Sequence, residues 1–210
     1  MFSKNQIEET LNTMSHGITA LTSIAGLTVL IVFGAMSDKD WALFSALFYG
    51  ISLMLLYMFS TLYHGIQHKK TKHIFRILDH CGIYLLIAGS YTPVILMSIG
   101  GKAGWIIFGI QWGLALIGIL LKIFYVGRFD VLSTLMYLVM GWMVVFQWDK
   151  LTNSISSTAF NLLLAGGLAY SIGVIFYLLD SKLKYSHFIW HLFVMAGSIL
   201  HYIMIIMFVI

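Results

Sequence analysis

Two histidines, His187 and His191, lie four residues apart in the stretch KYSHFIWHLF, where a long apolar run begins. Residues four apart share one face of a helix, so both imidazoles can point at one ion. Ser60 and His64 repeat this spacing in STLYHG, and Asp79 follows in LDHCGIYLL. Ionisable groups within membrane segments are costly and usually face a bundle interior or a wet cavity, so these residues predict a site.

A metal ion is the chemistry that this set of residues favours. Two histidines from one helix and one from another offer three nitrogen ligands; zinc accepts such a set and keeps a fourth position open for water, whose pKa it lowers to about 7. Asp79 would then hold or deprotonate the water, and Ser60 would support a ligand or polarise a substrate. Simpler interpretations stay open: interfacial histidines meet water and headgroups, Asp79 suits a helix start, and Ser60 can bond to its own helix.

The other histidines are weaker candidates. His68 and His73 lie among lysines, where we expect them to be solvated. His16 is expected at the membrane edge and could approach the cluster, but no pattern in the sequence fixes it there. His201 lies too far along its helix from the HxxxH pair to share the same ion, and His80 points about 100° away from the aspartate before it.

The composition indicates which elements must position these groups. Hydrophobic residues make up 60% of the chain and charged residues 10%, whereas soluble domains carry about 25% charged residues. We therefore expect an integral membrane protein. Cys81 is the only cysteine, which excludes an intrachain disulfide and a thiolate metal cluster. The net charge of +4 does not indicate nucleic-acid binding, because basic residues in a membrane chain mainly report topology and contact with anionic lipid headgroups.

Seven apolar runs have the length of about 20 residues that a helix needs to cross the bilayer. The predicted spans are 16–36, 41–64, 79–99, 104–125, 130–148, 159–179 and 187–209. Helices are expected because every backbone polar group must be satisfied within lipid. The fifth span is the weakest, because it is short and holds Gly141 and Gln147. The sequence thus predicts one all-α domain over residues 1–210, a polytopic bundle of seven transmembrane helices.

The distribution of basic residues predicts the orientation of this bundle. Seven spans put the N-terminus and the second, fourth and sixth loops on one side. That side carries Lys4, Lys69, Lys70, Lys72, Arg76, Lys122, Arg128, Lys182 and Lys184, and the other side carries Lys39, Lys102 and Lys150. The positive-inside bias then favours a cytoplasmic N-terminus and an outside C-terminus in the cell (inner) membrane. In this topology the candidate residues of three spans meet at the cytoplasmic membrane edge.

Four stretches carry a family resemblance. They are SHGI at 15–18, STLYH at 60–64, LDHCGIYLLIAGSYTP at 78–93 and SHFIWHLFVMAGSILHY at 186–202. In these the chain resembles the hemolysin III branch of the progestin and adiponectin receptor superfamily. The resemblance implies a seven-helix fold with an intracellular N-terminus. It also implies zinc held by His64, His187 and His191, with Asp79 engaging the zinc-bound water and Ser60 nearby.

The superfamily is similar to alkaline ceramidases, which implies metal-assisted hydrolysis of a lipid amide or ester. We therefore expect a zinc-binding membrane protein of hemolysin III type that hydrolyses a membrane lipid near the cytoplasmic membrane edge. Two alternatives stay open: a membrane-perturbing hemolysin that acts by cytolysis, and a non-enzymatic sensor of membrane state with structural zinc. An open fourth zinc position would permit catalysis, whereas a closed four-ligand site would be structural. The sequence names no substrate, protein partner or oligomeric state.

Overall fold

The computed structural model describes residues 4–210, which form helices joined by short connections and contain no strand. The α-helices are α1 Lys4–Met36, α2 Ala42–Gly65, α3 Lys69–Pro93, α4 Gly101–Tyr125, α5 Asp130–Gly141, α6 Trp148–Ser154, α7 Ser157–Leu178 and α8 Ser186–Met204. Three short segments of other helical type, η1 Val94–Ile99, η2 Met143–Gln147 and η3 Ile205–Val209, extend or connect them. Within the described residues, seven helices are long and apolar enough to cross a membrane, which confirms the predicted seven-helix fold.

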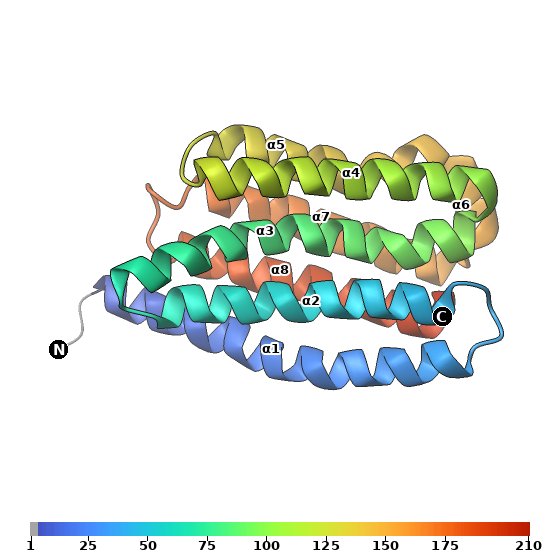
Figure 1. Cartoon of the computed structure of the whole chain (residues 1–210), viewed down its shortest axis with the longest axis horizontal. Coiled ribbons are helices and arrows are strands. Elements are labelled where there is room, and N and C mark those ends of the chain that lie inside the picture. The colour runs from blue at the N-terminus through green and yellow to red at the C-terminus, as the bar shows by residue number, and fades with distance from the viewer. Residues whose placement is uncertain (1–3) are drawn as a thin grey trace.

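The spans run antiparallel along the bundle, so that the N-terminal and C-terminal ends of the chain lie at opposite ends of the molecule (Figure 1). The most buried spans are those of α3, α2 and α8, at 61%, 50% and 39%, whereas 17–28% of each other span is buried. The other spans expose many large apolar side chains, as contact with lipid requires. The candidate site residues therefore lie on the three helices best able to keep polar groups away from lipid.

Two helices extend well beyond the apolar runs that predicted them. Helix α1 begins at Lys4, whereas the predicted span begins at residue 16, and α3 begins at Lys69, whereas the predicted span begins at residue 79. A helix satisfies its own backbone, so it can continue into the aqueous layer after its apolar residues end. A hydropathy count finds only the part within lipid. The extra turns matter because those of α1 carry Glu9 against α2 and Ser15 against α8.

The fifth span is interrupted where the sequence is weakest. Helix α5 ends at Gly141, and the chain continues as the 3-10 segment η2 and the short helix α6. The Tyr91 hydroxyl donates to the Gly141 carbonyl at 2.6 Å and accepts the Val144 amide at 3.0 Å. Gln111 donates its amide to the Met140 carbonyl at 2.8 Å. Side chains of α3 and α4 thus satisfy the freed backbone groups, as an interrupted membrane helix requires.

An ion pair between buried Lys122 and partly exposed Asp130 joins α4 to α5 at the end of the bundle where α2 also ends (Figure 1). The Lys122 ammonium lies 2.8 Å from the Asp130 carboxylate, and the Lys122 residue is only 1% exposed. Removing one partner would leave an uncompensated buried charge, so the pair ties the start of α5 to the end of α4.

Candidate metal centre

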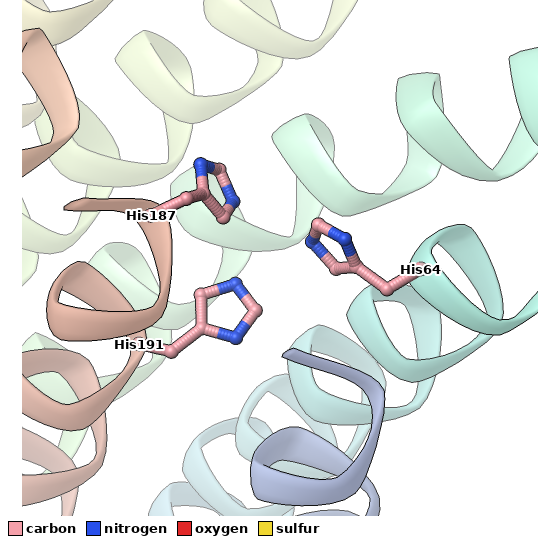
Figure 2. A group of neighbouring side chains, drawn as sticks. All are labelled: His64, His187 and His191. Atoms are coloured by element: carbon pink, nitrogen blue, oxygen red, sulfur yellow. The ribbon is translucent and has the colours of Figure 1, made fainter. Parts of the chain in front are cut away.

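Three histidine rings converge where the end of α2 meets the first turns of α8 (Figure 2). The ring centroids are 5.1 Å apart for His64 and His187, 5.0 Å for His64 and His191, and 4.9 Å for His187 and His191. One ring nitrogen of each histidine lies within 4.8 Å of the other two. The three imidazoles therefore surround a common point at nearly equal separations.

The three histidines are largely buried, so they are not a chance grouping of solvent-exposed side chains. His64 and His191 are 3% and 1% exposed, and the His187 side chain is 19% exposed. The buried Nε2 atom of His64 has no hydrogen-bond partner among the described residues. A buried polar nitrogen without a partner is costly, and an imidazole triad is a donor set that divalent transition metals favour. The triad could therefore hold a metal ion.

The outer nitrogen of each ring faces an oxygen atom. The Nδ1 atoms of His64, His187 and His191 lie 3.3 Å from Glu9 Oε2, 3.3 Å from Asp180 Oδ2 and 3.5 Å from Ser15 Oγ, respectively. Metal-binding histidines usually donate their second ring nitrogen to such an acceptor, which orients the ring. This arrangement leaves the three Nε2 atoms as the candidate donors to an ion.

A fourth histidine belongs to the same cluster. The His16 ring of α1 stacks on the His191 ring, with centroids 3.5 Å apart and planes 7° apart. Its Nδ1 atom lies 2.8 Å from Ser60 Oγ, and both residues are buried. The buried Nε2 atom of His16 has no partner within residues 4–210. Packing of α1 thus fixes His16, which the sequence left unplaced, beside one of the three clustered histidines.

Asp79 stands beside the triad instead of joining it. It lines a cavity of about 110 Å³ together with His16, Ser60, His187 and His191. Asp79 is partly buried, and its carboxylate makes no hydrogen bond to another described side chain. The predicted site residues Ser60 and Asp79 therefore border the same space as the rings of His16, His187 and His191, and the Asp79 carboxylate can meet a molecule in that space.

Comparison with known proteins identifies the family. A model of the family described as Haemolysin-III related matches residues 4–202. Hemolysin-3 of Bacillus cereus is 45% identical to the chain, over 96% of the chain and 92% of the relative. The Hemolysin-3 homolog of Bacillus subtilis (strain 168) is 48% identical, over 91% and 89%. The chain belongs to the hemolysin III family. It is also 30% identical to the human Monocyte to macrophage differentiation factor, over 93% of the chain and 82% of that relative.

Family membership confirms the resemblance found in the sequence. Together with the seven membrane-spanning helices, it identifies the chain as a multi-pass cell membrane protein.

The cavity of this hemolysin III family member continues from the histidines into an apolar interior. Leu56, Ile83, Leu86 and Val194 are among its walls. A second cavity, of about 50 Å³, shares six lining residues with it and extends to Leu151 and other residues of the fifth and sixth spans. The shared residues are Ser90, Tyr91, Gly141, Trp142, Gly167 and His201. The interruption of the fifth span thus lies where the two apolar cavities meet.

Sequence reasoning missed three residues of this family member's site: Glu9, Ser15 and Asp180. A signal for the first existed, because Glu9, Asn12 and His16 are spaced by three and four residues and therefore share a face of α1. No comparable signal marks Asp180, which lies in the connection between α7 and α8. The expectation for His68 and His73 holds, since both are exposed.

Proposed function

We propose that His64, His187 and His191 bind zinc and that the protein is a zinc-dependent hydrolase of a lipid amide or ester. The observation that carries the zinc site is the buried Nε2 atom of His64, which has no partner among residues 4–210 and belongs to a ring of three imidazoles. Zinc fits three neutral nitrogen donors and leaves a position for water, which is the pattern of catalytic zinc sites. When bound, zinc supplies a Lewis acid for a carbonyl oxygen and lowers the pKa of bound water.

The protein's own groups would divide the remaining work. The Asp79 carboxylate, which lines the cavity, would accept the proton of the attacking water. Ser60 Oγ, held at 2.8 Å from His16 Nδ1, would hydrogen-bond the substrate near its reacting carbonyl or steady the adjacent histidines. The buried walls would exclude bulk water, which strengthens each polar interaction at the site.

The shape and lining of the cavities favour a membrane lipid as the substrate. A polar end formed by histidines, Asp79 and Ser60 opens into walls of leucine, isoleucine, valine and aromatic residues. An amide or ester head would meet the polar end while an apolar chain occupies the interior. Residues of the most buried spans line this space, so the acyl chain of a bound lipid would meet apolar side chains there in place of the apolar chains of the bilayer.

The decisive experiment is metal analysis of the purified protein followed by a hydrolysis screen with ceramide and phospholipids. Wild type should hold about one zinc ion per chain, whereas His64→Ala and His187→Ala should lose it. His73→Ala removes an exposed histidine and is the matched control. Full zinc content in both site variants would refute the site. Zinc lost in both variants, with no lipid hydrolysed by wild type, would refute the hydrolase and favour a structural or sensory zinc.

The 45% identity to a protein named Hemolysin-3 supports a second candidate function, perturbation of membranes leading to cytolysis. This function needs no metal chemistry. It predicts that liposomes containing the protein leak a trapped dye and that the leakage survives His191→Ala. Leakage that disappears with His191→Ala would tie the effect to the histidine cluster and count against this candidate.

A further inference from the structure

An oxygen acceptor holds each of the three clustered histidines from outside, and two of these acceptors are carboxylates. Glu9 comes from α1, and Asp180 comes from the connection between α7 and α8. Neither α1 nor this connection supplies a nitrogen to the triad. The outer contacts therefore recruit two further segments of the chain to a cluster that α2 and α8 form.

Contacts from two helices, α2 and α3, fix the Glu9 carboxylate of α1. Its Oε2 atom lies 3.3 Å from His64 Nδ1 and 2.9 Å from the Lys72 ammonium. Lys72 also donates to the Tyr63 carbonyl at 2.9 Å and lies over the Tyr63 ring. A carboxylate oxygen is the acceptor in the contact with His64, so the proton of this contact is on His64 Nδ1. The lone pair is then on Nε2, the atom that faces the cluster without a partner.

The Ser15 contact leads to the same tautomer for His191. The Ser15 hydroxyl donates its only proton to the Asn12 carbonyl, at 3.0 Å. Its oxygen therefore accepts from His191 Nδ1, which lies 3.5 Å away. This contact is at the long end of the hydrogen-bond range, and the two carboxylate contacts are shorter, at 3.3 Å each.

Asp180 completes the pattern for His187. Its Oδ2 atom lies 3.3 Å from His187 Nδ1, and its side chain is 49% exposed. The connection that carries it is short, and Ser186 anchors its end by donating from Oγ to the Phe176 carbonyl at 2.7 Å. The carboxylate oxygen of Asp180 is the acceptor in this contact, so the proton lies on His187 Nδ1. His187 therefore also presents Nε2 to the cluster.

We infer that Glu9 and Asp180 are positioning residues of the candidate metal centre, which hold the proton of His64 and His187 on Nδ1 and turn each Nε2 toward the ion. This inference rests on the proposed metal site and extends it to α1 and to the α7–α8 connection. Removing such a partner of a metal ligand typically weakens metal binding about 10–100-fold.

The test is the zinc dissociation constant of the purified full-length protein in detergent, measured by competition with a chelator. Glu9→Leu and Asp180→Ala should each weaken zinc binding about 10–100-fold. Glu9→Gln keeps an acceptor oxygen without the charge, so its loss should be smaller than that of Glu9→Leu. Asp149→Asn removes a carboxylate from the first turn of α6, at the other end of the bundle, and should bind zinc as wild type does (Figure 1).

A second measurement separates positioning from a merely structural role. Nitrogen NMR of histidine-labelled, zinc-free protein should show Nδ1-protonated rings for His64 and His187, and Asp180→Ala should change the signal of His187 alone. Asp180 lies in an exposed connection, so this variant keeps the test sound if Glu9→Leu does not fold.

The outcomes distinguish this inference from the function on which it rests. Wild-type protein that binds no zinc would refute the proposed metal site. Wild-type protein that binds zinc, with Glu9→Leu and Asp180→Ala each within twofold of its affinity, would refute the positioning role and leave the metal site standing. Nε2-protonated rings in the zinc-free protein would also overturn the inference.

Discussion

His64 and His201 are both buried histidines of membrane-spanning helices, exposed by 3% and 9%, and both belong to stretches that carry the family resemblance. Their Nε2 atoms differ. That of His201 lies 3.0 Å from the Leu163 carbonyl oxygen of α7, which can only accept a hydrogen bond, so Nε2 carries the proton. That of His64 has no hydrogen-bond partner in the described part of the chain, while its Nδ1 atom faces Glu9.

The difference teaches how to separate a structural histidine from a candidate ligand. The hydrogen bond of His201 closes the nitrogen that could otherwise meet an ion, and the ring packs edge-on against Tyr170. The outer contact of His64 instead leaves a lone pair that points into a group of like residues. Burial and residue type are the same at both positions, so the partner of each ring nitrogen decides the role.

The strongest way to break the comparison is to remove each ring in turn and measure bound zinc. His64→Ala should reduce zinc from about one ion per chain to a small fraction of that, because two histidines are left to hold it. His201→Phe should keep the full content, because its Nε2 atom is not available to a metal. Equal zinc loss in the two variants, measured by elemental analysis, would show that the hydrogen-bond partner of Nε2 does not decide which histidine binds zinc.

The comparison extends to Asp79, whose carboxylate, like His64 Nε2, has no hydrogen-bond partner among the described side chains. Asp79→Asn should lower the turnover of a hydrolysed lipid about 10²–10⁴-fold, because an amide cannot accept the proton of water. Zinc content should stay at the wild-type level, since Asp79 lies outside the triad. Loss of zinc in Asp79→Asn would instead make this carboxylate a ligand. Asp149→Asn is the control for loss of a carboxylate.

Stability should depend more on His201 than on His64, which is the opposite of the order expected for zinc binding. His201→Phe keeps a ring beside Gly166 and Tyr170 but loses the hydrogen bond to α7, which should cost about 0.5–1.5 kcal/mol in the free energy of unfolding. Unfolding of the zinc-free protein in mixed detergents would measure this change. His64→Phe removes a buried nitrogen that has no partner among the described residues, and its lost Nδ1 contact leaves Glu9 still paired with Lys72, so its cost should not exceed that of His201→Phe. A larger loss for His64→Phe would contradict the comparison.

The smallest expected effect concerns the group that holds Glu9. Lys72→Gln leaves the carboxylate in place but removes a partly exposed ion pair, so zinc affinity should fall only by a factor of about 1.5 to 5. Chelator competition beside Glu9→Leu measures the difference. A loss in Lys72→Gln as large as that in Glu9→Leu would show that attachment of α1 to α3, and not the acceptor oxygen of Glu9, controls the site.

Much of the frame of the site can be predicted from local rules. The spacing of His187 and His191 places them on one helix face, because this depends only on the pitch of a helix. The order of the spans then puts the end of α2 and the start of α8 at the same membrane depth, which is where His64 meets the pair. Hydropathy misjudged the starts of α1 and α3, because polar turns of a helix outside lipid carry no apolar signal.

The sequence by itself determined seven membrane helices, the family, and a set of histidines at one end of the bundle. Only the tertiary structure decided that His16 stacks on His191, that Glu9 and Asp180 face the outer nitrogens, and that Tyr91 satisfies the interrupted fifth span. The physical reason is that spacing fixes which residues share a face of one helix, whereas the rotation and packing of neighbouring helices fix which faces meet. The packing of neighbouring helices therefore decides whether a ring nitrogen has a hydrogen-bond partner or is available to a metal ion.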